Sequence, residues 1–323
     1  MKILFVTSTR IGDAVLSTCL LSHIIAKYPD ASVTVACGPL PAPLFESVPG
    51  VEWVIAVQKK RFSGHWLSLW ATVMSTSWDI VVDLRASALA WTLRARSRKT
   101  LRSNDEGGTI HRVVELGRLF DLTPPPDPKL WLSDASVNEA KTIMPDGSPI
   151  IGLGVTANWL PKIWQAQNFV ALAGRLTDTN GVFPSARIAV FGAEEERALA
   201  QPVFDGLPKA QCIDLVGQNA LPTVAACLSK CALFIGNDSG LMHMAAAVRT
   251  PTIGLFGPSP AVRYGPWGKH CAAMESSESY AELVGGRSFD HRSTENLMTG
   301  LSVEAVEQAA HDLCAEIARG QDG

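Results

Sequence analysis

Several residues able to do chemistry lie in polar stretches that directly follow apolar runs. The first stretch places Asp13 at the mouth of an expected helix, where a carboxylate either caps the helix or acts as a general base on an acceptor hydroxyl. Arg10 lies three residues earlier and favours the ionised carboxylate if the two side chains are close. Asp13 is therefore the candidate catalytic base.

A second polar stretch, residues 236–240, separates an apolar run from a helix-forming segment. The free N–H groups of that helix, together with Ser239, Gly240 and, one turn later, His243, are the parts of a diphosphate-binding site. The alternatives are that Asp238 or the asparagine before it is an ordinary N-cap, and that the histidine is a satisfied, half-buried one. Because a carboxylate repels a diphosphate, Asp238 is expected to brace the loop or to bind a sugar hydroxyl.

Charged residues precede or begin two further expected helices. Lys162 lies between Trp159 and Trp164, just before a helix, where a cation opposes the helix dipole unless an anion is bound. This position favours contact with phosphate over an ordinary solvated lysine. Glu195 lies in the acidic start of another helix, residues 194–196; the dipole alone explains acidic residues there, and contact with a ribose hydroxyl is the functional alternative.

The composition is that of an ordinary globular protein. The 323 residues predict two domains, and 47% hydrophobic with 18% charged residues excludes a disordered chain. The apolar amino terminus is too short for a signal peptide, and no run approaches the length of a membrane span. Seven scattered cysteines without a C-x-x-C pair predict reduced, buried thiols, with no disulfide and no zinc. We therefore expect a cytoplasmic protein.

Apolar runs of strand length alternate with segments of helical periodicity, which is typical of parallel sheets covered on both faces. The expected class is α/β, with two facing Rossmann-like domains. The expected strands are residues 3–6, 33–36, 53–57, 80–82, 150–153, 188–191, 233–235 and 252–256, and the expected helices are residues 14–28, 66–75, 135–144, 166–176, 221–230 and 240–248.

Breaker-rich segments around residues 122–128 and 145–149 separate the two halves, and a new buried strand begins at Ile150. We place the boundary at 147, giving an acceptor-side domain 1–147 and a donor-binding domain 148–323, whose last helix is a candidate to pack back on the first. Ligands in such sheets bind beyond the carboxyl ends of the strands. The charge is divided as +2 and −5 between the halves.

Basic residues of the first half are candidates for contact with an anionic acceptor. A basic cluster at 59–61 precedes an aromatic stretch, residues 65–70, and five basic residues lie within 94–102. For each of these segments a solvated basic loop is the default interpretation, and contact with an acceptor is the functional one. Tryptophans beside basic residues also suit an anionic membrane surface, whereas the small net charge argues against nucleic acid. The candidate acceptor-binding residues are Arg10, Lys60, Arg61 and Arg85.

Four motifs, taken together and in order, resemble glycosyltransferase family 9, the ADP-heptose:lipopolysaccharide heptosyltransferases. They are RIGDAVLST from residue 10, W-x-x-K-x-W from residue 159, NDSGLMHMAAA from residue 237 and TPTIGLFGPSPAVRYGPWG from residue 250. The resemblance implies a GT-B arrangement, inversion at the anomeric carbon, no metal requirement, an ADP-sugar donor and a lipid-linked glycan acceptor, with peripheral association at an anionic membrane.

The same resemblance implies roles for individual residues. Asp13 matches the proposed base of the family, and Lys162, the Asp238-Ser239-Gly240 turn and His243 match its donor-diphosphate contacts. Glu195 is implied to face the donor ribose. Family members often have a Thr/Ser pair ahead of the lysine. This chain instead has Thr156 and Asn158, separated by an alanine, and we assign Thr156 and Asn158 to donor binding.

Other observations bear on metal and on the alternatives. None of the sixteen aspartates lies two residues from another, so the Asp-x-Asp motif of metal-dependent glycosyltransferases is absent, and the charge of the leaving group must be met by protein groups. The missing G-x-G-x-x-G argues against a dehydrogenase. A nucleotide-sugar epimerase of the same fold and a non-catalytic sugar-nucleotide-binding protein remain the alternatives to a transferase.

Overall fold

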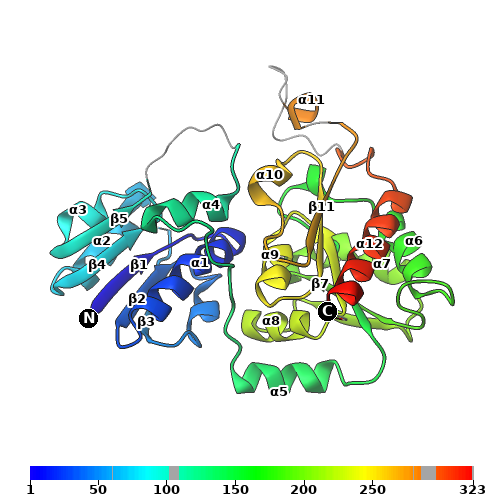
Figure 1. Cartoon of the computed structure of the whole chain (residues 1–323), viewed down its shortest axis with the longest axis horizontal. Coiled ribbons are helices and arrows are strands. Elements are labelled where there is room, and N and C mark those ends of the chain that lie inside the picture. Colours follow the sequence, from blue (N-terminus) through cyan, green and yellow to red (C-terminus); the bar gives the residue numbers. More distant parts are fainter. Residues whose placement is uncertain (60, 102–108, 279, 285–295, 322–323) are drawn as a thin grey trace. The chain divides into compact units, whose positions relative to one another are not determined.

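The computed structural model describes residues 1–59, 61–101, 109–278, 280–284 and 296–321. It divides into two compact domains, Met1–Ser133 and Asp134–Gly323, each built around one parallel sheet (Figure 1). No helix among the described residues is long and apolar enough to cross a membrane.

The first domain has a five-stranded sheet in the order β3-β2-β1-β4-β5, with every pair parallel. Its central strand β1 pairs on both sides, Phe5 lying opposite Val35 and Val82, and its Leu4 and Val6 are buried in a core cluster with Leu69 and Leu89. The elements are β1 Lys2–Val6, α1 Ile11–Lys27, β2 Ser32–Cys37, η1 Ala42–Phe45, β3 Val51–Ala56, η2 Arg61–Ser63, α2 Gly64–Val73, β4 Trp78–Asp83, α3 Leu89–Thr92, β5 Ala95–Thr100, α4 Arg112–Gly117 and η3 Arg118–Phe120.

The second domain has a six-stranded parallel sheet in the order β11-β10-β9-β6-β7-β8. Its core joins the strands to α6, α7 and α12. The elements are α5 Asp134–Ile143, β6 Ile150–Gly154, η4 Leu160–Lys162, α6 Ala166–Thr177, β7 Arg187–Gly192, η5 Glu194–Glu196, α7 Arg197–Gly206, β8 Cys212–Val216, α8 Leu221–Ser229, β9 Leu233–Asn237, α9 Gly240–Ala247, β10 Thr252–Phe256, α10 Ala261–Tyr264, β11 Cys271–Glu275, α11 Tyr280–Val284 and α12 Val303–Gln321.

The strand order reverses once in each sheet, and these reversals mark the expected binding edges. In the first sheet the reversal falls between β1 and β4, and in the second between β6 and β9. Loops that leave such neighbours run in opposite directions and open a crevice at the carboxyl ends of the strands. The predicted base follows β1, Lys162 follows β6 and Asp238 follows β9.

The division between the domains differs from the expected boundary at 147. It falls between Ser133 and Asp134, so α5 belongs to the second domain. The reason is packing: α5 lies against α8, where Thr223 Oγ1 donates to Glu139 Oε2 at 2.5 Å and Lys230 pairs with Asp146. The breakers around residues 145–149 therefore form a turn within this domain.

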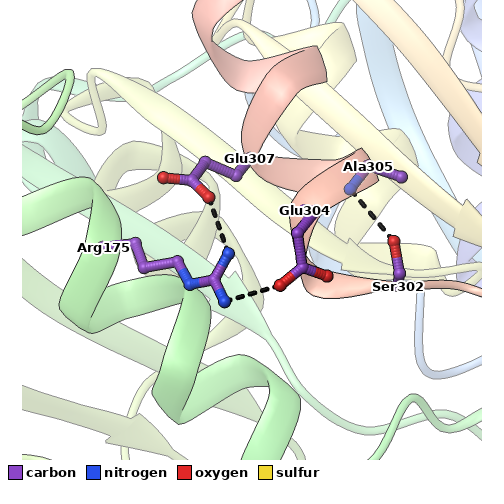
Figure 2. A network of polar contacts seen from close by, with 5 residues as sticks. All are labelled: Arg175, Ser302, Glu304, Ala305 and Glu307. Carbon is purple, nitrogen blue, oxygen red and sulfur yellow. Dashed lines mark hydrogen bonds and ion pairs between the residues drawn. The ribbon is translucent and has the colours of Figure 1, made fainter.

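The last helix, α12, is part of the core of the second domain. Helix α12 lies against α6 and β11 of its own domain, and Val306, Ala310 and Leu313 join that core. Figure 2 shows the polar rim of this contact, where the Arg175 guanidinium of α6 bonds Glu304 at 2.6 Å and Glu307 at 2.9 Å.

The eight expected strands and six expected helices are all present, with small differences at their ends. Three strands were missed, namely β5, β8 and β11. The basic segment expected as a solvated loop is in fact β5, an edge strand, where exposed Arg94 and Arg96 flank the half-buried Ala95. Charge on an edge strand hides the apolar pattern and discourages pairing with another chain.

Candidate functional site

Residues 7–10 connect β1 to α1 at the carboxyl edge of the first sheet. Helix α1 begins at Ile11, its N-cap is Arg10, and the Arg10 side chain makes no capping hydrogen bond. Asp13 is therefore the third residue of the helix, so its interpretation as an N-cap is wrong. Its half-buried carboxylate accepts one long hydrogen bond, 3.5 Å, from Ser8 Oγ, and retains acceptor capacity for a further hydroxyl.

Arg10 does not neutralise Asp13. Its side chain is exposed, and within the described residues it forms no ion pair with that carboxylate. The loop itself is held rigidly: Ser17 Oγ donates to Ala14 O at 2.7 Å, so the Thr7 hydroxyl donates to Ser17 Oγ, also at 2.7 Å. The start of α1 is thus anchored to the end of β1.

Asp83, the last residue of β4, shapes the neighbouring loop. Its Oδ1 accepts the Arg85 N–H at 2.9 Å, and its Oδ2 accepts the N–H and hydroxyl of Ser87 at 3.0 and 2.6 Å. Burial raises the pKa of the Asp83 carboxyl, against the effect of these hydrogen bonds. Asp83 is not among the residues predicted from the sequence, although an aspartate that ends an apolar run before a polar loop indicates such a role.

Arg85, like Arg10, is a predicted acceptor-side residue that the fold brings to this edge. Its guanidinium lies 5.9 Å from the ring centroid of Trp66 on α2, and both line a small pocket with Thr7, Thr9 and Lys59. The pocket therefore adjoins the loop that leads to the predicted base. Lys60 lies outside the described residues, as does the side chain of Arg61.

In the second domain, an ion pair joins the loops that follow β6 and β9. Lys162 Nζ lies 2.5 Å from Asp238 Oδ2, with the lysine 20% and the aspartate 9% exposed at their side chains. The lysine lies in the short helix η4 after β6. The carboxylate therefore holds the cation at the point where the strand order reverses, and the cation offsets its charge.

A second link lies just behind the ion pair. Asn237, fully buried at the end of β9, accepts the backbone N–H of Trp164 through Oδ1 at 3.0 Å, and the indole N–H of Trp164 donates to Leu301 O at 2.9 Å. Trp164 is fully buried. The second tryptophan of the W-x-x-K-x-W motif is therefore a core residue that fixes the lysine-bearing loop.

Helix α9 begins at Gly240 without a side-chain cap. Its N-cap is Ser239, in an extended conformation and without a capping hydrogen bond, so the interpretation of Asp238 or Asn237 as an ordinary N-cap is wrong. The Ser239 Oγ is buried and has no partner within the described residues, as is true of Asn237 Nδ2 and of Ser259 Oγ after β10. Buried polar atoms are normally satisfied, so this edge offers polar groups to a ligand. His243 is buried one turn into α9.

The acidic start of η5 approaches the same edge through Glu196. Thr156 Oγ1 and the backbone N–H of Ala193 donate to Glu196 Oε2 at 2.7 and 2.9 Å, which leaves Oε1 without a hydrogen bond in the described part of the chain. Glu195 is exposed, as is Asn158, whereas Thr156 is buried. The helical periodicity of the sequence does not show which of the three consecutive glutamates faces this edge.

The second edge combines features that suit a diphosphate. A cation, an uncapped helix N-terminus carrying partial positive charge, and buried polar atoms lie where the strand order reverses. The domain as a whole carries 13 Lys and Arg against 20 Asp and Glu, so attraction of an anion there is local. No group of three or more metal-ligating His, Cys, Asp or Glu side chains occurs among the described residues.

Comparison with known proteins shows relatives along nearly the whole chain. Lipopolysaccharide heptosyltransferase 2 of Salmonella typhimurium is 25% identical over 297 residues, which cover 80% of this chain and 83% of the relative. The solved structure of the E. coli ADP-heptose lps heptosyltransferase II matches with a TM-score of 0.77 at 20% identity, covering 98% of this chain and 100% of that one.

A glycosyltransferase family 9 structure from Veillonella parvula matches with a TM-score of 0.81 at 21% identity, covering 98% of this chain and 97% of that one. These similarities confirm the expected class of two Rossmann-like α/β domains with parallel sheets, of the GT-B type. The profile of glycosyltransferase family 9 (heptosyltransferase) matches residues 109–291, more than half of the chain. The chain therefore belongs to glycosyltransferase family 9.

Proposed function

We propose that this protein is an inverting heptosyltransferase, which moves a heptose or a related sugar from an ADP-sugar to a lipopolysaccharide-core or similar lipid-linked glycan. The observation that carries the proposal is the placement of the family motifs: Asp13 follows the strand at which the first sheet reverses, and the Lys162–Asp238 pair spans the reversal of the second. The names of the relatives, lipopolysaccharide heptosyltransferases, supply the sugar and the acceptor class.

The proposed reaction is one in-line displacement. Asp13 takes the proton of an acceptor hydroxyl while that oxygen forms a bond to the anomeric carbon, and the bond from this carbon to the diphosphate oxygen breaks. ADP leaves with the electron pair, and configuration inverts. Among the described residues Asp13 accepts one long hydrogen bond, so most of its lone pairs remain available to an acceptor hydroxyl.

The departing diphosphate needs positive charge in the second domain. Lys162 and the N-terminus of α9 are the proposed sources, with Ser239, Gly240 and His243 beside them. Asp238 is proposed to hold Lys162 and, when the diphosphate binds, to share that cation or to contact a sugar hydroxyl. Its carboxylate therefore need not repel the donor, since its charge is already paired.

The ribose of the donor is proposed to meet the acidic start of η5. Glu196 replaces Glu195 as the favoured contact, because its Oε2 is fixed by Thr156 while its Oε1 has no hydrogen bond to any residue that the structure describes. Thr156 then acts by orienting this glutamate, and Asn158, which is exposed, remains a proposed donor contact.

On the acceptor side, Arg10, Lys60, Arg61 and Arg85 are proposed to meet phosphates or carboxylates of the glycan. Such an acceptor is anchored in lipid, so we propose a cytoplasmic enzyme that associates peripherally with an anionic membrane. We also propose that transfer needs no metal ion, since Lys162 and the helix terminus supply the positive charge.

The test compares Asp13→Asn with Asp30→Asn, which changes an exposed carboxylate between α1 and β2. We expect Asp13→Asn to lower kcat at least about 100-fold while thermal stabilisation by ADP is unchanged, and Asp30→Asn to behave as wild type. Undiminished transfer by Asp13→Asn would exclude Asp13 as the base. Epimerisation of the nucleotide sugar in the absence of an acceptor would identify the protein as an epimerase. Binding of the donor without any turnover would identify it as a non-catalytic binding protein.

A further inference from the structure

Helix α2 of the first domain is a surface helix without charge. Residues 62–78 include no Asp, Glu, Lys or Arg. Leu69 and Val73 of this helix are buried in the core against the sheet, but its outer side carries Leu67, which is 68% exposed, with Met74 just beyond its end, 42% exposed. A surface helix of a soluble protein normally places charged residues opposite its core face, whereas the exposed residues of this one are Leu67, Ser68, Ala71 and Thr72, none of which is charged.

The residue that precedes α2 adds to the same exposed surface. Phe62 is 98% exposed, and its backbone is left-handed at φ 51°, as is that of Ser63 at φ 58°. Two successive left-handed residues that are not glycine are unfavourable and persist only where the surrounding structure imposes them. The chain thus holds a phenyl ring in solvent through a strained turn.

Neighbouring groups fit the surface of an anionic membrane. Helix α3 shares a core cluster with α2 and carries Trp91, which is 67% exposed; tryptophan is enriched at membrane interfaces. No acidic residue lies between Glu52 and Asp79, whereas three basic residues, at 59–61, come directly before Phe62. Apolar side chains bordered by cations are typical of segments that lie in the headgroup layer of anionic bilayers.

The inner side of α2 reaches the predicted acceptor edge. His65, Trp66 and Leu69 line the small pocket that also includes Thr9 and Arg85. One helix therefore borders both the pocket beside the Asp13 loop and the exposed apolar surface. An acceptor whose glycan enters this pocket and whose lipid remains in a bilayer needs this adjacency.

We propose that Phe62, Leu67 and Met74, here called the α2 surface, insert into the headgroup layer of an anionic phospholipid bilayer and so place the acceptor pocket at the membrane. This inference rests on the proposed function, because it takes the acceptor to be lipid-linked. Attachment then has an apolar component in addition to the electrostatic one, and raised salt weakens it without abolishing it.

The experiment measures sedimentation of the full chain with vesicles containing about 30% phosphatidylglycerol. The test variant is Leu67→Gln with Met74→Gln, and the matched control is Leu40→Gln with Leu199→Gln, whose exposed fractions, 68% and 39%, nearly equal those of the test pair. We expect the test variant to have a partition coefficient roughly tenfold below that of the wild type. Adding Phe62→Ser to the test variant should lower the coefficient further, and the control variant should bind as the wild type does.

Equal binding by the test and control variants would overturn the proposal, as would complete loss of wild-type binding at about 0.5 M NaCl. A test variant that binds vesicles normally but changes its mass in solution would instead identify the α2 surface as a contact between copies of the chain. Transfer to a soluble, delipidated acceptor distinguishes the membrane proposal from the proposed transferase function. The test variant should transfer sugar to this acceptor as the wild type does. Absence of transfer by the wild type would contradict the proposed function itself.

Discussion

The ammonium of Lys162 and the carboxylate of Asp238 lie 2.5 Å apart, although 76 residues separate them in the chain. The pair connects the loops of the two strands at which the second sheet reverses its order. It gives Asp238 a function that requires no direct contact with phosphate, because the aspartate fixes the position of the cation.

Breaking this pair should affect stability and donor binding together. Lys162→Met leaves a nearly buried carboxylate without a partner and should lower the free energy of unfolding by about 1–3 kcal/mol, less than for a fully buried pair because the lysine is partly exposed. Adding Asp238→Asn should recover part of this loss. Urea unfolding of the single and double variants measures the coupling.

The pair of Lys230 with Asp146, whose carboxylate is 89% exposed, is the control for that cycle, and Lys230→Met should change stability by less than about 1 kcal/mol because it leaves a solvated carboxylate. Additive effects of the Lys162 and Asp238 changes would show that the ion pair has no energetic coupling.

Ser239 should matter to the ligand and not to the free protein. Because its Oγ makes no capping hydrogen bond, Ser239→Ala should leave thermal stability nearly unchanged and weaken binding of ADP roughly fivefold to tenfold. Calorimetry of folding and of binding separates the two effects.

Ser302 provides the contrasting case. Its Oγ accepts a hydrogen bond from the Ala305 N–H at 3.2 Å at the start of α12 (Figure 2). Ser302→Ala should therefore lower the free energy of unfolding by about 1 kcal/mol and leave the affinity for ADP unchanged. A comparable stability loss in Ser239→Ala would contradict an uncapped α9.

Two adjacent glutamates should behave differently. Glu196→Gln removes the anionic acceptor held by Thr156 and should raise KM for the donor about tenfold, whereas Glu195→Gln, at an exposed position, should leave KM unchanged. Steady-state kinetics at saturating acceptor distinguish them, and the opposite ranking would restore Glu195 as the ribose contact.

Buried thiols should make the protein less stable in alkali. Burial raises the pKa of Cys19 and of Cys37 to about 12, from 9.0, so the folded protein keeps protons that the unfolded chain loses near pH 9. Stability should therefore fall as pH rises above about 9, by up to about 1.4 kcal/mol per pH unit for each such thiol. Urea unfolding between about pH 8 and pH 10 tests the slope.

Replacing Cys19 and Cys37 together by alanine should reduce that slope, even if it lowers stability at every pH, and the raised pKa of the Cys227 thiol should preserve part of it. The same thiols should resist thiol reagents at about pH 8 until the protein unfolds. Rapid modification of both in the native state would contradict their burial.

The sequence by itself determined the α/β class, the buried strands and the order of the motifs. Near-continuous Val, Ile and Leu runs such as 233–235 reveal central parallel strands whatever surrounds them. It missed β5 and β8 because strands near a sheet edge have one solvent-facing side and carry charge there, as Arg96 of β5 and Asp214 of β8 do.

Only the tertiary structure decided which polar residues meet. Whether Asp13 or Asp238 caps a helix depends on where that helix begins, to within one residue, and no local pattern fixes this. The pairing of Lys162 with Asp238, the choice of Glu196 over Glu195 and the bonds from Asp83 to the Arg85 loop all join atoms positioned by tertiary packing or loop geometry. Residue types and spacing supplied candidates for these roles, and the strand order of each sheet placed the candidates of each domain at the carboxyl edge of that domain's own sheet.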